Sequence, residues 1–314
     1  MGPSLDHPSD TGAPSGRFRR VLKVLLGLLF VVSAVLKIVD MDPFEIYVYS
    51  YGFFRLNVSF VVARLAIILE LVLGICLIFN WFHKLTWWAS LLMLLGYTGL
   101  MAYALWLGRT DHCHCFGEFL RFKPLPSLIK NLVMLLWLAF LYPIRGRSFR
   151  GQGLALVGVA LACALAVFVI SPPDFLLRNE EGQVSPVLLE ELLQEPPLDA
   201  MNLDEGKKAV AFFSTGCAFC KMTARKLSLM QSFHGFPEED VCYVFMGNEA
   251  NVEAFFEESE SKRFPFAMVD DPLRLLKLID GKFPTVLLLE DGRAVRVFDF
   301  RNLDEAGLKK FFAE

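Results

Sequence analysis

AVAFFSTGCAFCK, residues 209–221, is the stretch that decides the fold of the C-terminal part of this chain. It begins with a short apolar run, which predicts a buried strand, and continues into two cysteines with two residues between them. A helix is predicted to begin near Cys217 and to end near Ser232. The free N–H groups and positive field of a helix N-terminus stabilise a thiolate, so Cys217 is predicted to be the reactive cysteine. Cys220, one turn further along, is placed to release a mixed disulfide formed on Cys217.

Strands and helices are predicted to alternate around this stretch. The predicted strands are 208–214, 241–246, 266–269, 285–290 and 294–298, and the predicted helices are 187–193, 217–232, 249–258, 273–278 and 303–312. Asp291-Gly292 separates the last two strands and is a hairpin signal. The pattern predicts an α/β domain over residues 207–314, preceded by a proline-punctuated connector over residues 172–206.

Three pieces of this region resemble the thioredoxin superfamily: the strand AVAFF, the turn STGCAFCK, and Phe283-Pro284-Thr285 before the hairpin. The resemblance covers roughly residues 185–314. It implies a thioredoxin-like fold and a cis peptide bond between Phe283 and Pro284. It also implies that Pro284 packs beside the active sulfurs and belongs to the catalytic site.

Two positions depart from that family. Many members carry a buried acid six residues before the first cysteine, where this chain has Ala211. The residues between the cysteines are Ala218 and Phe219, neither the Gly-Pro of reducing members nor the Pro-His of strong oxidants. The resemblance therefore implies no direction of electron flow. A structural disulfide, or a degenerate domain used only for binding, stays open as an alternative.

The N-terminal half has a different composition. The chain is 54% hydrophobic, and the apolar residues concentrate before residue 172. Five apolar runs there are each long enough for a helix to cross a hydrocarbon core of about 30 Å. These predicted spans are 21–39, 58–79, 85–107, 125–142 and 154–171. The predicted fold class is a membrane α-helical bundle of five spans followed by the α/β thioredoxin-like domain.

The N-terminal half is predicted to contain a tail, a four-helix domain and a fifth helix. Residues 1–19 are predicted to be a disordered cytoplasmic tail, because their first part is rich in Pro, Ser, Gly and Asp. Residues 20–142 are predicted to form a four-helix membrane domain, and residues 143–171 the fifth transmembrane helix. The segment between the first two spans, about residues 40–55, is predicted to be a loop.

Basic residues give the predicted orientation. They concentrate in the segments on one side of the five spans, which is typical of the cytoplasmic side. These residues are Arg17, Arg19, Arg20, Lys84, Arg145, Arg147 and Arg150. The chain is therefore predicted to lie in the cytoplasmic (inner) membrane with its C-terminal domain extracytoplasmic, or periplasmic. A net charge of −3 and the lack of a long basic stripe exclude nucleic acid as a predicted partner.

A second cysteine pair, Cys113 and Cys115, follows the third predicted span and falls on the same side as the C-terminal domain. Because a Cys-x-Cys disulfide closes a small ring, it should be strained and easily reduced. His112 and His114 flank these thiols, and an imidazole can accept a thiol proton or stabilise a thiolate. The two dithiols are therefore predicted to exchange electrons.

The stretches SAVLKIVDMDPFEIYVYSYGF, ARLAIILELVLGI and DHCHCFGEF resemble the DoxX-like and MauE-like membrane family, over about residues 20–142. Cys113, Cys115, Phe116 and Gly117 fit that family's Cys-x-Cys-Phe-Gly motif. The resemblance implies disulfide formation or quinone-linked electron transfer. His112 and His114 are less typical of the family.

The two histidines keep a metal alternative open. His112, Cys113, His114 and Cys115 are suitable ligands for zinc or copper, although four consecutive residues rarely wrap one ion. A metal site is therefore not predicted. The corresponding alternative function is a non-enzymatic assembly factor or metal chaperone.

Ionisable residues in the spans have two open interpretations. Arg64 and Glu70 are predicted either to pack against neighbouring helices or, together with His114, to form a quinone or proton site. Lys37 is expected to snorkel to the interface. Cys76 and Cys163 are expected to be packing residues, with a reductive thiol relay from the cytoplasm as the alternative, and Cys242 is expected in the core.

These observations predict a membrane-bound thiol–disulfide oxidoreductase. Electrons would pass between the Cys217–Cys220 pair, the Cys113–Cys115 pair and a quinone, which is implied by the family resemblance alone. The predicted partners are extracytoplasmic thiol/disulfide proteins and membrane lipid, and no covalently bound cofactor is predicted.

Overall fold

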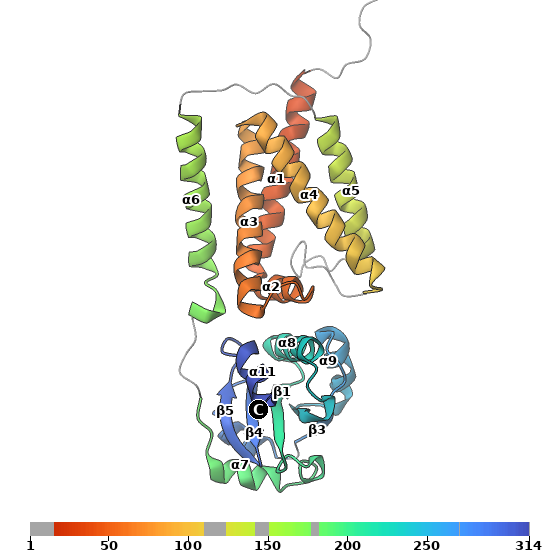
Figure 1. Ribbon diagram of the computed structural model, residues 1–314, viewed down its shortest axis with the longest axis vertical. Helices are drawn as coiled ribbons and strands as arrows, with labels where there is room; N and C mark the ends of the chain where they lie inside the picture. The colour runs from red at the N-terminus through yellow and green to blue at the C-terminus, as the bar shows by residue number, and fades with distance from the viewer. Residues whose placement is uncertain (1–15, 110–123, 142–150, 177–181, 270, 314) are drawn as a thin grey trace, which may run out of the picture. The chain divides into compact units, whose positions relative to one another are not determined.

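A computed structural model of the chain describes residues 16–109, 124–141, 151–176, 182–269 and 271–313. The chain divides into two compact units. The first is made of Met1–Asp40 with Leu65–Ile170, and the second of Met41–Arg64 with Ser171–Glu314. Figure 1 shows helices in the first unit and a sheet with helices in the second.

The long apolar helices lie where the sequence predicts them. They are α1 Gly16–Val39, α3 Leu56–Phe79, α4 His83–Trp106, α5 Pro124–Phe140 and α6 Gln152–Ile170. Within the described residues, α1, α3, α4 and α6 are long and apolar enough to cross a membrane, whereas α5 has 17 residues and falls just short. The prediction of five spans is therefore confirmed for four of them.

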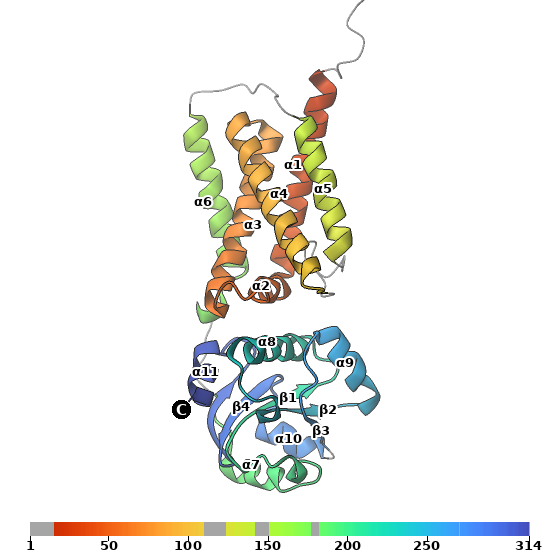
Figure 2. The same cartoon turned by 45° about the vertical axis from the view of Figure 1, so that its right-hand side comes forward.

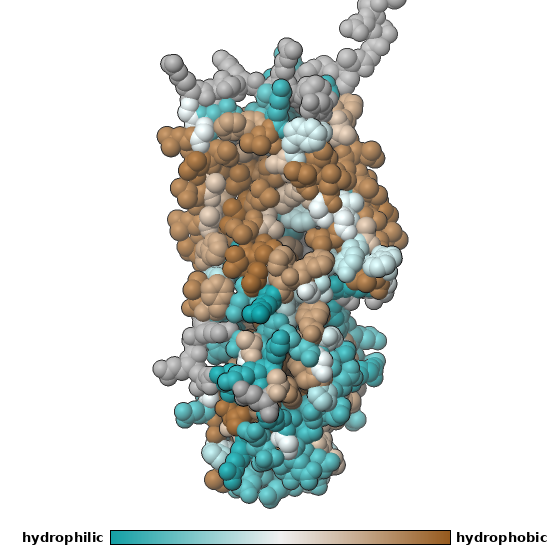
Figure 3. Space-filling model, viewed as in Figure 1, coloured by the Kyte–Doolittle hydropathy of each residue, from teal (hydrophilic) through white to brown (hydrophobic). Residues whose placement is uncertain are grey.

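The surface of these helices fits a lipid environment. Trp106 and Leu154 are each 80% exposed, and Leu136 is 73% exposed. Apolar side chains cover the visible face of the helical unit in Figure 3. Since such a surface would be unfavourable in water, the chain is an integral membrane protein.

Helices α1 and α3 contact each other through two glycines. A Cβ atom placed on Gly27 would lie 2.7 Å from the carbonyl oxygen of Gly74, and one on Gly74 would lie 2.9 Å from that of Gly27. Small residues at both positions let the two backbones approach closely, as is common in membrane helices. Leu26 and Phe30 of α1 then pack with Leu73 of α3 in the core of this unit.

The second unit contains a five-stranded mixed sheet in the order β3-β2-β1-β4-β5. The strands are β1 Lys207–Ser214, β2 Val241–Met246, β3 Phe266–Met268, β4 Thr285–Glu290 and β5 Arg293–Phe298. β1, β2 and β3 pair in parallel, while β4 is antiparallel to both β1 and β5. Strand order, pairing and the cis bond between Phe283 and Pro284 are those of the predicted thioredoxin-like fold.

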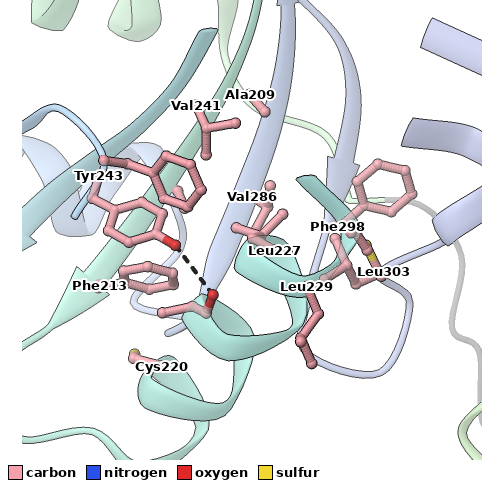
Figure 4. Packing of buried hydrophobic residues seen from close by; sticks show 14 of the residues in the cluster. Ala209, Phe213, Cys220, Leu227, Leu229, Val241, Tyr243, Val286, Phe298 and Leu303 are labelled. Atoms are coloured by element: carbon pink, nitrogen blue, oxygen red, sulfur yellow. Dashed lines mark hydrogen bonds between the residues drawn. The ribbon is translucent and has the colours of Figure 1, made fainter. Parts of the chain in front are cut away.

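Helices cover both faces of this sheet, as Figures 1 and 2 show. They are α7 Pro186–Leu193, α8 Ala218–His234, α9 Val252–Ser259, α10 Pro272–Leu278 and α11 Glu305–Ala313. Alternate residues of β1 supply the two cores: Phe213 packs with α8 and α9, and Phe212 packs with α7 and α10. In Figure 4, the Tyr243 hydroxyl of β2 donates to the Ala224 carbonyl of α8 at 3.2 Å. This bond ties the helix that carries the cysteine pair to the sheet.

The predicted loop between the first two spans is wrong in part, because it contains a helix, α2 Met41–Tyr49. Ile46 and Tyr49 of α2, and Leu56 and Phe60 of α3, belong to the same buried cluster as α8. Glu305 of α11 accepts a hydrogen bond from the Leu56 N–H at 2.7 Å. Residues far before the sheet therefore complete the core of the second unit.

Candidate redox site

Cys217 is the N-cap residue of α8. Its backbone is extended, with φ −84° and ψ 120°, and the helix begins at the next residue. Two backbone bonds fix the approach from β1: the Cys217 N–H donates to the Ser214 carbonyl at 3.1 Å, and the Thr215 N–H donates to the Met246 carbonyl at 3.2 Å. The strand, turn and helix that the sequence predicts thus place Cys217 at the N-terminus of α8.

Gly247 leaves room for this turn. Its φ is +132°, and a Cβ atom there would lie 2.5 Å from Thr215 Oγ1. A side chain at this position would be both strained and in collision with the turn. Gly247 therefore allows the end of β2 to pack directly against the residues before Cys217.

The environment of Cys217 favours its thiolate. Hydrogen bonds lower the pKa of Cys217 to about 6; the one with the Cys220 side chain contributes most, and backbone N–H groups and the Lys221 charge add to it against the opposing effect of burial. The Cys220 N–H, one of the free donors of the first helical turn, lies 3.2 Å from Cys217 Sγ. At neutral pH, Cys217 is thus largely a nucleophilic thiolate.

Cys220 has the opposite character. Its side chain is fully buried, and burial raises the pKa of Cys220 far above the ordinary thiol range, with the hydrogen bond to Cys217 adding to the effect. Neither cysteine is in a disulfide. Ala211 of β1 is also fully buried, and its methyl group offers no proton acceptor. Cys220 therefore stays a protonated thiol until its sulfur is needed.

Apolar residues surround this pair. Phe219, between the two cysteines, is 44% exposed, and its ring centroid lies 5.1 Å from that of Phe300. Phe283, which precedes the cis bond to Pro284, packs against the same core cluster as Cys217. The catalytic role of Pro284 stays a prediction from resemblance.

The second cysteine pair lies outside the described residues. Cys113 and Cys115, with His112 and His114, fall in the segment 110–123, so their predicted redox or metal roles stay predictions. Among the residues that the structure does describe, no group of three His, Cys, Asp or Glu side chains could hold a metal ion.

Arg64 and Glu70 both lie on α3 but in different clusters. Lys37 Nζ lies 2.6 Å from Glu70 Oε2 and 2.8 Å from Ser33 Oγ, and it stands 5.5 Å from the centroid of the Tyr97 ring. The expectation that Lys37 snorkels is wrong: its side chain is only 4% exposed, because Glu70 supplies a buried counter-ion.

Arg64 is held within the second unit instead. It forms an ion pair with Glu45 of α2 and donates to the carbonyl oxygens of Phe60 and Ser171, each at 2.8 Å. These contacts account for its charge without a cofactor. The structure therefore does not bring Arg64 and Glu70 together as one site.

The other described cysteines lie inside regular elements. Cys76 is buried on α3 and Cys163 is half-buried on α6, and neither is in a disulfide. Cys242 lies in the apolar core around β2, as expected, and burial raises the pKa of Cys242 to about 11.

Sequence reasoning missed three residues near the cysteine pair: Asp174, Lys226 and Phe300. Lys226 is 1% exposed and forms an ion pair with Asp174 at 3.2 Å. The sequence does contain a signal for Lys226, because this charged residue falls on the buried face of the predicted helix. Its partner could not have been inferred, because Asp174 comes 52 residues earlier in the chain.

Residues 16–144 match the family model described as methylamine utilisation protein MauE. The membrane region is a MauE-family region. The matched residues agree with the resemblance predicted over residues 20–142. Protein TlpB of Flavobacterium psychrophilum is 24% identical to the chain over 302 residues, which cover 79% of this chain and 82% of that protein.

A solved structure matches the other part of the chain. The solution structure of a thiol:disulfide interchange protein from Bacteroides sp. is 17% identical, with a TM-score of 0.29. The match covers 36% of this chain and 78% of that chain. The thioredoxin-like fold of the second unit rests on its own strand order and pairing.

Proposed function

We propose that the chain is a membrane-bound thiol–disulfide oxidoreductase. The observation that carries this proposal is the opposite character of the two cysteines on one helical turn. Cys217 is half-buried with a pKa of about 6, whereas Cys220 is fully buried and its pKa is raised. One sulfur is thereby prepared to attack, and the other is held back to resolve the product.

The exchange with a partner disulfide takes two steps. The Cys217 thiolate attacks the partner, so a bond between Cys217 and a partner sulfur forms while the partner S–S bond breaks. The Cys220 sulfur then loses its proton and attacks Cys217, which closes the Cys217–Cys220 disulfide and releases the second partner sulfur. The domain is oxidised by two electrons, and the partner gains two thiols with one proton from Cys220 and one from solvent. The reverse sequence oxidises a partner dithiol.

We further propose that Cys113 and Cys115 exchange electrons with this domain on the extracytoplasmic side. The charge distribution of the predicted loops and the membership of residues 16–144 in the MauE family support this step. The exchange again needs only thiols and disulfides: one pair gains the two electrons and two protons that the other loses.

A quinone is the acceptor or donor that the family resemblance implies. A bound quinone would take up or supply two electrons and two protons. Buried Ser33, Lys37 and Glu70, together with half-buried Tyr97, offer a hydroxyl, an ammonium group, a carboxylate and an aromatic ring within the helical unit. This donor set is compatible with a quinone ring and its oxygens, so we propose Glu70 and its neighbours as the holding residues. Arg64 pairs with buried Glu45, so we propose a structural role for it.

The test is a trapping experiment on the full chain in its native membranes. Cys220→Ser removes the resolving sulfur, so mixed disulfides between Cys217 and partner proteins should accumulate. The matched control, with Cys217→Ser added, should form none. Absence of any Cys217 adduct in the single variant would refute the enzymatic proposal. For the relay, Cys113→Ser should shift the steady-state redox state of the Cys217–Cys220 pair.

A further inference from the structure

Lys226 is a buried cation on the helix that carries the redox motif. It lies nine residues after Cys217 on α8, and its side chain is 2% exposed. A buried ammonium group is strongly unfavourable unless a counter-ion and hydrogen bonds compensate for its lost hydration. The residues around Lys226 must therefore supply both.

Asp174 supplies the counter-ion. It lies in a short 3-10 helix, Asp174–Leu176, soon after the last apolar helix in sequence. Its Oδ2 atom is 3.2 Å from Lys226 Nζ, and its Oδ1 atom accepts a hydrogen bond from Arg301 Nη1 at 2.6 Å. Each carboxylate oxygen thus has a cationic partner, and the side chain of Asp174 is only 4% exposed.

Phe300 receives two further interactions of Lys226. The Nζ atom donates to the Phe300 carbonyl at 3.1 Å and stands 3.7 Å from the centroid of the Phe300 ring. A cation this close to an aromatic face, away from water, is an attractive contact. Lys226 therefore fixes both the backbone and the ring of Phe300.

The Phe300 ring in turn supports Phe219. Their centroids are 5.1 Å apart with an interplanar angle of 58°, and Phe300 is 5% exposed whereas Phe219 is 44% exposed. Phe219 is one of the two residues between the cysteines. A continuous set of contacts therefore runs from Asp174 through Lys226 and Phe300 to the exposed ring beside Cys217.

We propose that Lys226, neutralised by Asp174, is a positioning residue that holds Phe300 against Phe219 and so fixes the apolar surface met by a partner polypeptide at Cys217. The inference rests on the proposed thiol–disulfide exchange. It commits to a partner whose cysteine is flanked by an apolar side chain, because only such a side chain gains by covering the exposed part of Phe219. A small thiol reagent covers none of that surface.

The test uses the full chain, reduced and in detergent micelles, and two synthetic peptides. Each peptide carries one cysteine in a mixed disulfide with a chromogenic thiol, and the peptides differ only in Leu or Ser beside that cysteine. The wild-type protein should react with the Leu peptide roughly tenfold faster than with the Ser peptide. Lys226→Met and Phe300→Ala should bring the two rates within about threefold of each other. Alkylation of Cys217 by iodoacetamide should keep its wild-type rate and pH profile in both variants.

Lys226→Met is chosen because it removes the buried charge while Asp174 keeps its bond to Arg301. Glu253→Gln is the matched control: it breaks an exposed ion pair with Arg263 on α9 and should leave the Leu preference unchanged. A thermal unfolding curve for each variant checks folding. If Lys226→Met does not fold, the Phe300→Ala protein provides the test of the positioning role, since it keeps the ion pair between Lys226 and Asp174.

Two outcomes separate the proposals. If a folded Lys226→Met or Phe300→Ala protein keeps the full Leu preference, or if the wild type shows none, the positioning role is wrong while exchange at Cys217 stands. If wild-type Cys217 reacts with neither peptide, the proposed function itself fails.

Discussion

The two units of the molecule hold cysteines in opposite settings. In the helical unit, Cys76 lies in the last turn of α3 and Cys163 in the middle of α6, where the nearby backbone N–H groups are used by the helix itself. In the second unit, Cys217 lies at the N-cap of α8, and its sulfur accepts a hydrogen bond from the Cys220 N–H. The difference indicates that position at a helix N-terminus, more than the presence of a thiol, makes a cysteine reactive.

Replacing the cysteines of each unit separately tests this difference in reactivity, and it should give the largest effect. Cys217→Ser should abolish thiol–disulfide exchange, because it removes the sulfur that the first turn of α8 prepares for attack. The double variant Cys76→Ser, Cys163→Ser should retain exchange near the wild-type rate. The measurement is reduction of a peptide disulfide by the reduced full chain. Loss of exchange in the double variant would favour the reductive relay through α3 and α6.

Buried ion pairs offer a second comparison, since each unit buries a lysine with a carboxylate. Glu70→Gln should destabilise the helical unit by about 3–5 kcal/mol, because it leaves the Lys37 ammonium buried without its carboxylate. The double variant Lys37→Met, Glu70→Leu should recover most of that loss. Thermal unfolding in detergent measures both. Cys217 reactivity toward a small disulfide should stay unchanged, because Cys217 belongs to the other compact unit. A parallel loss of reactivity would contradict this expectation.

The redox turn packs the Thr215 side chain closely against Gly247, and an added methyl group can test this contact. Gly247→Ala should cost about 1–3 kcal/mol, because it adds backbone strain and a collision with Thr215. It should also slow alkylation of Cys217 by displacing the turn. Gly206→Ala is the matched control: its φ is +69°, but nothing lies within 4 Å of the added Cβ. Equal effects of the two variants on Cys217 would show that the Thr215 contact is irrelevant to the site.

The same contrast explains what the sequence could predict. The strands of the second unit were predicted almost to the residue, because β1, β2 and β4 are short apolar runs with clear ends. The position of Cys217 at a helix start followed from the spacing of the motif alone. Local patterns were sufficient wherever the determining interactions are local.

The errors arose where a partner lies far along the chain. Lys37 appeared free to snorkel because Glu70 is 33 residues away, and Arg64 could not be assigned to Glu45 before α2 was known. The sequence predicts a loop where helix α2 lies, because this charged segment separates two apolar spans, although Glu45 is buried against Arg64. Such pairings are fixed by tertiary packing, which periodicity does not reveal.

The lowered pKa of Cys217 also makes stability depend on pH. The pKa of this thiol is about 6 in the folded protein, against 9.0 for an unperturbed thiol. Between these values the unfolded chain binds more protons, so the stability of the reduced protein relative to Cys217→Ser should rise from pH 6 to pH 9 and be lost below pH 6. Urea unfolding of both proteins at several pH values would measure this pH dependence, and a flat difference would contradict it.

The most direct test of the central claim is the pH profile of Cys217 alkylation in the reduced full chain, with the modified residue identified by mass spectrometry. The alkylation rate should follow a single thiol with a midpoint near pH 6, while Cys220 should stay unmodified over the same range. A midpoint near the unperturbed value of 9.0, or faster modification of Cys220, would contradict the proposed division of roles between the two sulfurs.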